Sequence, residues 1–357
     1  MKTVICGGGV IGLLTARELA LAGQEVVVID RSEPGQESSW AGGGIVSPLY
    51  PWRYPPAVSA LAAHAQRLYP ALAEALCQES GIDPEYVASG MLMLDADDER
   101  DARAWAAEQG REMEILAGDE LARHFPELAG FGQGIWLPGV ANIRNPRLMQ
   151  ALQVSLQRQG VQILPGREAC GWLRREGRIA AVETRQGGYV EGERFVITAG
   201  AWTAGLTAGL GIHVPVRPVR GQMLLFRAAV SALTKIVLHQ GHYVIPRRDG
   251  HILCGSTMEE TGFDKSTTPE AADKLQRVAE RLVPALKGSR PVAHWAGLRP
   301  GSPNGIPFIG ALPGEDNVWV NAGHFRNGLV LAPASARLLA DQLLGRPALV
   351  PAGPYRL

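Results

Sequence analysis

Three glycines near the start of the chain have a spacing that can bind a phosphate group. Gly7, Gly9 and Gly12 form a G-x-G-x-x-G motif. The first glycine permits a tight turn, the second lets the backbone approach a pyrophosphate, and the third lets a helix lie close to a strand. Asp30 follows about 20 residues later, where a carboxylate can accept hydrogen bonds from ribose hydroxyls and would repel a 2′-phosphate. The motif therefore predicts a dinucleotide other than NADP.

The segments around these residues have the patterns of a strand, a helix and a second strand. Residues 2–6 (KTVIC) predict a short buried strand, and residues 10–21 predict a packed helix of small and apolar residues. Residues 25–30 (EVVVID) predict a second buried strand. The helix begins just after the glycines, so its free N–H groups and the positive end of its dipole can meet a phosphate. Together these segments predict a Rossmann-type unit rather than an isolated glycine-rich turn.

Further segments favour flavin adenine dinucleotide (FAD) over NAD. Residues 38–52 are small and glycine-rich; we expect them to be neither helical nor strand-like and to lie against a large planar ring. An NAD domain would continue here with further alternating strands and helices. Residues 195–202 (FVITAGAW) predict a strand that ends in small residues, and residues 318–344 predict a strand, a glycine-containing turn and a long helix. Dinucleotide-binding segments thus occur at both ends of the chain.

The chain must therefore leave its first domain and return to it. We expect an α/β fold, α+β overall, with two domains, since 357 residues exceed one ordinary core. The FAD-binding domain is expected at residues 1–80, 145–215 and 295–357, and the substrate-binding domain at residues 81–144 and 216–294. Residues 221–258 are strand-rich with a turn at 248–250, which predicts an antiparallel sheet in the second domain.

Composition restricts the kind of partner. Lys plus Arg equals Asp plus Glu at 35 each, so no basic field attracts nucleic acid or a membrane surface, and a small-molecule ligand is expected. Cys6, Cys77, Cys170 and Cys254 are scattered singly, which predicts no metal site and favours reduced, mostly buried thiols. The chain opens directly into a strand, and no apolar run is long enough to span a bilayer. These features predict a cytoplasmic protein.

Five blocks form a recognisable set over nearly the whole chain: CGGGVIG, SSWAGGGI, GHYVIPRRDGHILCGSTM, HWAGLRPGSPNGIPFIG and AGHFRNGLVLAPA. Together they resemble the D-amino-acid oxidase-like flavoproteins, and most closely the glycine oxidases linked to thiamine biosynthesis. The resemblance implies an FAD-dependent enzyme that oxidises the carbon–nitrogen bond of a small amino acid, with glycine as the expected substrate. The glycine oxidases that resemble this chain are homotetramers, so a similar assembly is implied.

The resemblance also implies which residues hold FAD. They are Gly7, Gly9, Val10, Ile11, Gly12, Asp30, Arg31, Ser38, Ser39, Ala41, Gly42, Gly43, Ile45, Cys170, Ala199, Gly200, Gly323, Arg326, Asn327, Gly328 and Leu329. Some relatives, the monomeric sarcosine oxidases, attach FAD through a cysteine in the C-terminal region. No cysteine follows Cys254 here, so non-covalent binding is expected.

Three residues are expected to act on the substrate. Glycine at neutral pH carries a carboxylate, which needs a cation with two parallel donors, and an arginine fork supplies both charge and orientation. Arg299 in WAGLRPG is the expected anchor, as the resemblance also implies. Tyr243 in HYVIP is expected to donate its phenol to the same carboxylate. Arg326 in GHFRNG matches a position beside the substrate and flavin, and is expected to contact the carboxylate or the product.

Other residues are expected to shape the pocket. Met258 matches an apolar wall of that pocket, and Ser47 and Tyr50 are expected to line the cleft. His242 and His324 flank the site motifs, but we expect structural roles for both. Hydride transfer from the α-carbon needs an unprotonated substrate amine and correct geometry rather than a strong base.

The expected reaction oxidises glycine to an imine, which is hydrolysed to glyoxylate and ammonia while dioxygen is reduced to hydrogen peroxide. In thiamine-making relatives the imine feeds thiazole formation instead. Sarcosine and D-amino acids remain alternative substrates, because one sequence does not define the shape of the cleft.

Two other functions are alternatives. The segments VRPVRGQMLL, GSTMEETGFDKSTT and WAGLRPGSP also resemble the hydrogen cyanide synthase subunit that oxidises glycine and passes electrons to partner chains. The compact length and the lack of extra cysteine motifs argue against this dehydrogenase. A tRNA-modifying flavoprotein would need a basic surface or a fused methyltransferase domain, and the chain shows neither.

Overall fold

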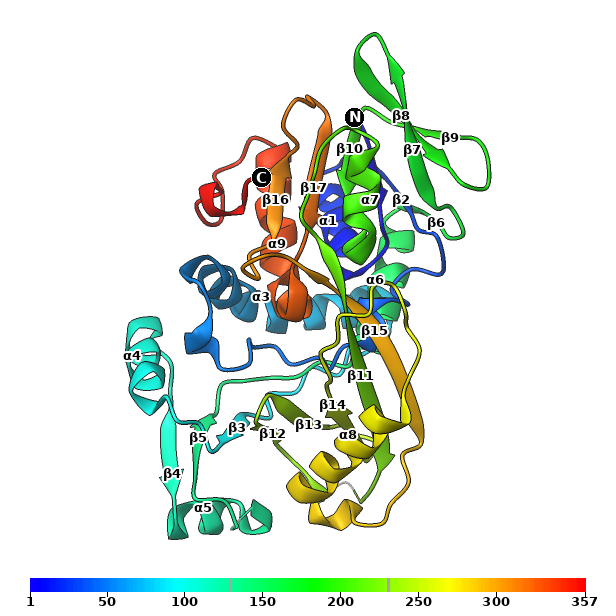
Figure 1. Ribbon diagram of the computed structural model, residues 1–357. Coiled ribbons are helices and arrows are strands. Elements are labelled where there is room, and N and C mark those ends of the chain that lie inside the picture. The colour runs from blue at the N-terminus through cyan, green and yellow to red at the C-terminus, as the bar shows by residue number, and fades with distance from the viewer. Residues whose placement is uncertain (129, 230–231) are drawn as a thin grey trace.

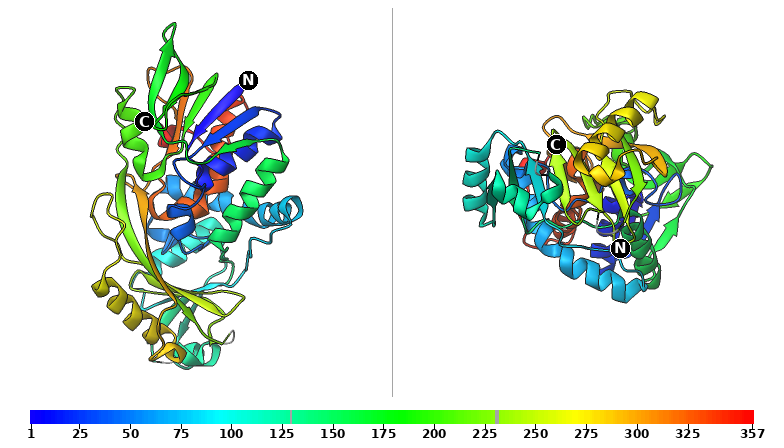
Figure 2. Two further views of the ribbon diagram at one scale, coloured as in Figure 1. Left: turned by 90° about the vertical axis from the view of Figure 1, so that its right-hand side faces the viewer. Right: turned by 90° about the horizontal axis from the view of Figure 1, so that it is seen from below.

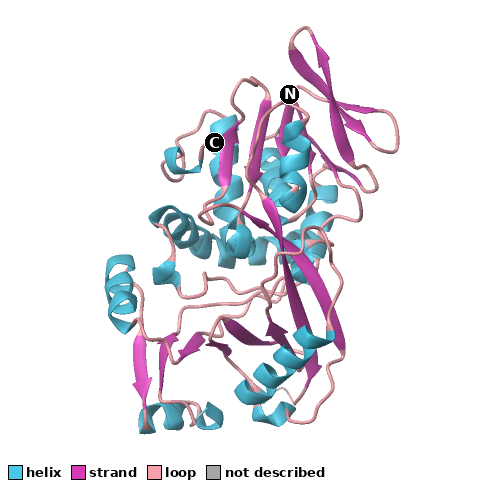
Figure 3. Cartoon of the chain, in the orientation of Figure 1, coloured by secondary structure: helices cyan, strands magenta, loops and turns pink. Residues whose placement is uncertain are grey.

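Two large β-sheets divide the protein into an upper and a lower half in the view of Figure 1. The computed structural model describes residues 1–128, 130–229 and 232–357. Within them, one sheet has six strands, one has eight and a small one has three. Both chain ends lie in the upper half, where helices pack on the six-stranded sheet (Figures 1 and 3).

The six-stranded sheet is assembled from three distant parts of the chain. Its strands are β1 (Lys2–Cys6), β2 (Glu25–Ile29), β6 (Gln162–Leu164), β10 (Arg194–Ile197), β16 (Phe308–Ala311) and β17 (Val318–Ala322). Their order is β16-β17-β10-β1-β2-β6, and all neighbours are parallel except β16 and β17. Strands such as EVVVI are apolar on both faces because both faces of this sheet are covered.

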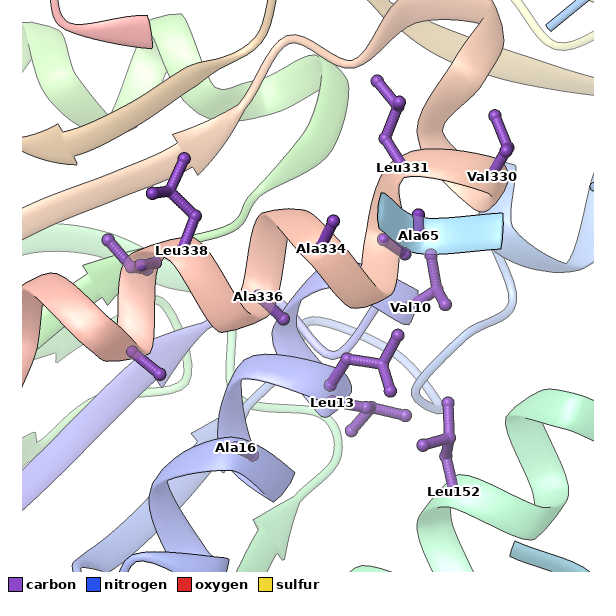
Figure 4. Packing of buried hydrophobic residues seen from close by; sticks show 14 of the residues in the cluster. Val10, Leu13, Ala16, Ala65, Leu152, Val330, Leu331, Ala334, Ala336 and Leu338 are labelled. Carbon is purple, nitrogen blue, oxygen red and sulfur yellow. The ribbon is translucent and has the colours of Figure 1, made fainter. Parts of the chain in front are cut away.

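Three helices cover one face of this sheet, and a fourth, at residues 56–80, packs on two of them. They are α1 (Val10–Leu21), α3 (Pro56–Ser80), α6 (Asn145–Arg158) and α9 (Gly328–Leu343). Figure 4 shows small and branched side chains of α1 and α9, among them Leu13, Ala16 and Ala336, meeting in one buried cluster. The small residues let the two helices approach closely, so the N-termini of both can reach the same region of the protein.

The other face is covered by the three-stranded sheet and one short helix. These elements are β7 (Ala169–Arg175), β8 (Arg178–Thr184), β9 (Tyr189–Glu191) and α7 (Thr203–Ala208). Trp172 meets Phe195 edge to face, with ring centroids 5.9 Å apart. This contact joins the small sheet to the buried side of β10.

The eight-stranded sheet forms the lower half. Its strands are β3 (Met91–Leu94), β4 (Glu114–Ala117), β5 (Gln133–Leu137), β11 (Arg217–Arg227), β12 (Ile236–His239), β13 (His242–Pro246), β14 (His251–Gly255) and β15 (Ala293–Gly301). Their order is β15-β11-β14-β13-β12-β3-β5-β4. The long strands β11 and β15 run from the lower half up toward the six-stranded sheet (Figures 1 and 2).

Three helices accompany the lower sheet: α4 (Glu99–Gln109), α5 (Asp119–His124) and α8 (Pro269–Leu282). The sequence of α8 explains its position. The Thr268 hydroxyl accepts a hydrogen bond from the Ala271 N–H at 3.3 Å and caps the helix. Leu275, Ala279 and Leu282 then repeat at helical spacing and are buried in the core beneath the sheet.

Most predicted elements are confirmed. The predicted strands at residues 2–6 and 25–30, the helix at 10–21 and the strand, turn and helix at 318–344 all occur. The expected FAD-binding segment 295–357 includes most of β15 (Ala293–Gly301), which pairs in the eight-stranded sheet. The domain boundaries remain a prediction. Among the described residues, no helix is long and apolar enough to cross a membrane.

Three expectations need correction. The lower sheet is mixed rather than antiparallel, because β3 enters it from an earlier part of the chain and pairs in parallel with β12. Residues 38–52 include a helical turn, α2 (Ser38–Ala41), which forms because no glycine interrupts the chain before Gly42 and the Ala41 N–H reaches the Glu37 carbonyl. Cys77 and Cys170 are exposed, while only Cys6 and Cys254 are buried.

Candidate active site

One cavity with a volume of about 430 Å³ reaches from the first glycine motif to the lower sheet. At one end it is lined by the turn that follows β1 and by the first turn of α1. At the other end it is lined by residues of β11, β13 and β15. The cavity therefore joins the expected dinucleotide site to the expected substrate site.

The glycine motif adopts the conformation that its spacing predicts. Gly7 has a φ of +119°, and a Cβ there would lie 2.4 Å from the Thr198 carbonyl oxygen. A Cβ on Gly12 would lie 1.9 Å from the Gly7 carbonyl oxygen. Only glycines allow β1, the turn and α1 to pack this closely, so the first turn of α1 meets the cavity beside Gly9.

Asp30 braces the same turn from the end of β2. One carboxylate oxygen accepts the Gly8 N–H at 2.7 Å, and the other accepts the Ser32 N–H at 2.9 Å. Burial raises the pKa of Asp30, and these two hydrogen bonds oppose that shift. Next to it, the Arg31 guanidinium lies 3.5 Å from the centre of the Trp202 ring and pairs with Glu37.

The segment from α2 to Gly43 is fixed in place by partly buried hydrogen bonds. The Ser39 hydroxyl, within α2, accepts the Val10 N–H at 2.9 Å, which ties the segment to the start of α1. Arg247 donates to the Gly43 carbonyl at 2.7 Å and to the Ile143 carbonyl at 3.1 Å. Burial lowers the pKa of Arg247 to about 10. The glycine-rich segment is thus a rigid wall of the cavity rather than a free loop.

A second helix begins at the same cavity. Gly328 and Leu329, in the first turn of α9, line it together with Asn327, the residue before that turn. The side-chain amide nitrogen of Asn327 is buried and has no hydrogen-bond partner among the described residues. The free N–H groups of a helix start and this amide are donors that an electron-rich ring edge would satisfy.

The opposite end of the cavity is a floor of glycines with three large side chains. Register places Tyr243, Gly255 and Met223 opposite one another on β13, β14 and β11, and the Tyr243 hydroxyl is 3.6 Å from the Met223 sulfur. Gly221 lies two residues before Met223 on the same face of β11. The Arg299 guanidinium covers Gly221, because a Cβ there would lie 2.1 Å from an Arg299 nitrogen.

Two arginines at this end have no acidic partner. Among the described residues, neither Arg299 nor Arg326 has a carboxylate within 4.0 Å, although most other arginines near the cavity do. Burial lowers the pKa of Arg299, because removing the cation from water disfavours its charge. This end of the cavity is therefore complementary to an anion of the substrate.

Most residues predicted from the sequence meet at the cavity. Arg299, Tyr243, Arg326 and Ser47 line it. The predicted cofactor residues that line it are Gly7, Gly9, Val10, Ile11, Asp30, Arg31, Ser38, Ser39, Ala41, Gly42, Gly43, Ile45, Cys170, Ala199, Gly200, Arg326, Asn327, Gly328 and Leu329.

Four predicted residues lie outside the lining. Gly12 supports the glycine turn from within α1, and Gly323 lies between the lining residues Ala322 and His324. The Tyr50 hydroxyl accepts the Gly241 N–H at 3.3 Å instead of facing the cavity.

Met258 is the fourth, and its expected role as a pocket wall is not supported. Its side chain is 59% exposed. The side chains of Thr257 and Glu259 on either side of it turn inward to Gln222, so Met258 points the opposite way.

Many lining residues escaped the sequence analysis, among them Gly221, Met223 and Ser256. Gly221 and Met223 could have been found from the strand predicted at residues 221–228, because alternate residues of a strand share one face. A similar alternation on β15 brings Gly297 and Arg299 to the cavity together. Ser256 carried no local signal, since it follows a strand and its contact comes from another strand.

The surroundings of His242 and His324 are those of residues with a structural role. The His324 ring shares a 2.6 Å hydrogen bond with the Ser335 hydroxyl, which donates to the Asn321 side chain at 2.8 Å. Burial lowers the pKa of His324 to about 3. Burial also lowers the pKa of His242. Among the described residues, neither ring pairs with a carboxylate that would prepare it as a base.

Because the His324 ring is buried, we expect the stability of the folded protein to depend on pH. The unfolded chain binds a proton at His324 below pH 6.5, whereas the folded protein does not until about pH 3. The free energy of unfolding should therefore fall as the pH drops from 6.5 toward 3, by about 1.4 kcal/mol per pH unit. Urea unfolding at pH 7.5 and 5.0 measures how much free energy of unfolding is lost between these two pH values. This loss should be about 2 kcal/mol smaller in His324→Gln than in the wild type.

His213→Gln is the matched control, because His213 is exposed. It should keep the pH dependence of the wild type. An equal loss of stability in His324→Gln and wild type would contradict the assignment of a neutral, buried ring.

The family can be identified from the whole chain. Residues 2–342 match the family described as FAD dependent oxidoreductase. The chain belongs to this family. It is an oxidoreductase, and its cofactor is FAD.

Three similar proteins have related names. The glycine oxidase of Pseudomonas aeruginosa is 51% identical over 99% of this chain and 98% of its own. The crystal structure of glycine oxidase from Geobacillus kaustophilus has a TM-score of 0.94 and 28% identity, over 99% of this chain and 97% of its own. The bifunctional protein ThiO/ThiG of Trichormus variabilis is 31% identical over 95% of this chain and 52% of its own length.

The residues of the cavity fit FAD. The close packing at Gly7 and Gly12, the Asp30 carboxylate and the start of α1 suit a pyrophosphate and ribose. The unpartnered Asn327 amide and the start of α9 suit the polar edge of a flavin ring. When bound, FAD would supply a two-electron acceptor for the oxidation of the substrate.

Proposed function

We propose that this protein catalyses the oxidative deamination of glycine. The observation that carries the proposal is the end of the cavity where Arg299, Arg326 and Tyr243 meet without an acidic residue to balance the two cations. A small amino acid brings the missing carboxylate. The 51% identity to a glycine oxidase supports the choice of glycine.

The arginine pair explains how an amino acid would be held. An arginine fork binds a carboxylate through two parallel hydrogen bonds, which fixes both the position and the orientation of the substrate. The Tyr243 hydroxyl, whose contact in the structure is a weakly accepting methionine sulfur at 3.6 Å, can donate to the same carboxylate. With its carboxylate fixed, the substrate presents its α-carbon toward the rest of the cavity.

The reaction then needs correct position rather than a strong base. Overall, glycine and dioxygen yield the imine and hydrogen peroxide, and water converts the imine to glyoxylate and ammonia. The buried floor of β11, β13 and β14 excludes water from the substrate. The absence of water favours the uncharged form of the substrate amine, and in this form the α-carbon can lose its C–H bond. The relative named ThiO/ThiG supports a further role for the imine as a precursor of the thiamine thiazole.

Met223 is proposed as the wall that limits substrate size. It is 2% exposed, lines the cavity and contacts the Tyr243 hydroxyl. Shortening it in Met223→Ala should raise kcat/KM for D-alanine relative to glycine by about tenfold, because a methyl group would gain room. Steady-state rates with both substrates measure this ratio. Met258→Ala should leave the ratio unchanged, and a shift in Met258→Ala alone would reverse the assignment.

The first test of the function is a flavin titration. The purified yellow protein is mixed anaerobically with glycine, sarcosine, D-alanine or L-alanine while the absorption of oxidised flavin is followed. Bleaching by glycine, followed by rapid reoxidation and peroxide formation in air, is the expected result. Bleaching without reoxidation would assign the dehydrogenase that passes electrons to a partner chain. No bleaching by any of the four would reject the substrate class.

The setting of the enzyme is also part of the proposal. All four cysteines are unpaired, which supports the reducing environment of the cytoplasm. No cysteine lies beyond Cys254, which supports non-covalent FAD. A homotetramer is proposed from the resemblance to glycine oxidases, and light scattering of the purified holoenzyme measures it.

A further inference from the structure

The Arg299 guanidinium is held by neutral groups alone. One terminal nitrogen donates to the Ser256 hydroxyl at 2.7 Å, and the other donates to the Arg220 carbonyl at 3.2 Å. No carboxylate lies within 4.0 Å of it among the described residues. A guanidinium has five N–H donors, so these two contacts leave donors free for a ligand.

The backbone beneath Arg299 leaves little freedom for its position. A Cβ on Gly221 would lie between 2.1 and 2.4 Å from three guanidinium atoms, so the group lies directly on the main chain of β11. The Arg220 carbonyl also accepts the Glu259 N–H at 3.0 Å, which holds this acceptor still. On the other side, the Ser256 hydroxyl is the one side-chain partner of the guanidinium among its hydrogen bonds.

Ser256 is well placed to orient a cation. It directly follows β14, is 8% exposed and lines the cavity. The next residue anchors it, because the Thr257 hydroxyl accepts the Gln222 N–H at 2.9 Å. A fixed acceptor on one side of a guanidinium selects the rotamer that turns the remaining donors toward the cavity.

We propose that Ser256 is a positioning residue that orients the Arg299 guanidinium for the substrate carboxylate. The proposal rests on the proposed function, since it takes Arg299 as the carboxylate anchor. Ser256 does not need to touch the substrate. Because it holds the Arg299 side chain in one conformation beforehand, less conformational entropy is lost when the carboxylate binds. Ser256 therefore affects substrate binding more than the rate of the chemical step.

The test compares Ser256→Ala with Ser256→Thr in the FAD-loaded enzyme. Acetate serves as the probe, because it is a carboxylate that cannot be oxidised, and calorimetry measures its Kd. Ser256→Ala should raise the Kd of acetate and the KM of glycine about tenfold, with kcat changed less than twofold. Ser256→Thr keeps the hydroxyl and should restore both values. Ser80→Ala is the control: it removes a buried hydroxyl of α3 that donates to the Leu76 carbonyl and lies outside the cavity lining, so it should leave the Kd of acetate and the KM of glycine unchanged.

Each outcome separates this proposal from the proposed function. Acetate binding that weakens in Arg299→Ala but not in Ser256→Ala would overturn the role of Ser256 and leave the anchor in place. A failure of Ser256→Thr to restore binding, or an equal effect in Ser80→Ala, would also overturn that role. If acetate binds and responds as expected while glycine is not oxidised, Ser256 is supported and the substrate assignment falls. Absence of acetate binding in the wild type would reject both.

Discussion

Arg299→Ala should lower kcat/KM for glycine by a factor corresponding to about 3 kcal/mol or more of transition-state binding. Arg299 has no acidic partner within 4.0 Å among the described residues and shares its end of the cavity with Tyr243 and Arg326. Removing it takes away a charge and a pair of parallel donors, while the phosphate-binding turn at the far end of the cavity keeps its contacts. Steady-state kinetics and the flavin absorption of the purified variant measure the two effects separately.

Two further variants define what the loss means. Arg299→Lys keeps the charge but not the planar fork, so it should recover only part of the activity. Arg100→Ala removes an exposed arginine of α4 and should match the wild type in rate and FAD content. Normal turnover in Arg299→Ala would reject Arg299 as the anchor. Loss of FAD together with activity would instead indicate a structural defect.

Gly12→Val is expected to give a colourless, destabilised protein. Even a Cβ at this position would lie 1.9 Å from the Gly7 carbonyl oxygen and 2.7 Å from the Thr198 hydroxyl. Because Gly7 belongs to the packed turn and Thr198 directly follows β10 and donates to the Gly7 carbonyl, α1 must move away from β1, at a cost of about 3 kcal/mol in stability. The shift also removes the first turn of α1 from the cavity. Flavin absorption per protein and thermal unfolding measure both consequences.

Gly139→Ala is the matched control for this change. Gly139 is exposed, has no positive φ, and a Cβ there would meet nothing within 4 Å. It should keep its FAD and its melting temperature. A yellow, stable Gly12→Val protein would show that α1 can separate from β1 without loss of the cofactor, which would contradict the role given to Gly12.

The two halves of the site differ in how far the sequence determines them. The dinucleotide end is built from neighbours in the chain: Gly7, Gly9 and Gly12 act within one turn, and Asp30 closes the next strand. Local patterns report such sites directly, because the same few residues set both the backbone shape and the chemistry. Arg299 and Tyr243 needed the resemblance to a family, since nothing local distinguishes them from structural residues.

The substrate end depends on which strands pair and in what register. The sequence by itself determined the α/β class, the return of the chain to its first sheet and the dinucleotide turn, whereas the choice of Arg299 and Arg326 as site residues also needed the resemblance to a family. Only the tertiary structure brought Met223 to the cavity, turned Met258 to solvent, and set the Ser256 hydroxyl against Arg299. It also placed β3 in parallel beside β12. The physical reason is that a one-residue shift in strand register sends every side chain to the opposite face, so contacts between distant strands are decided by packing rather than by local sequence.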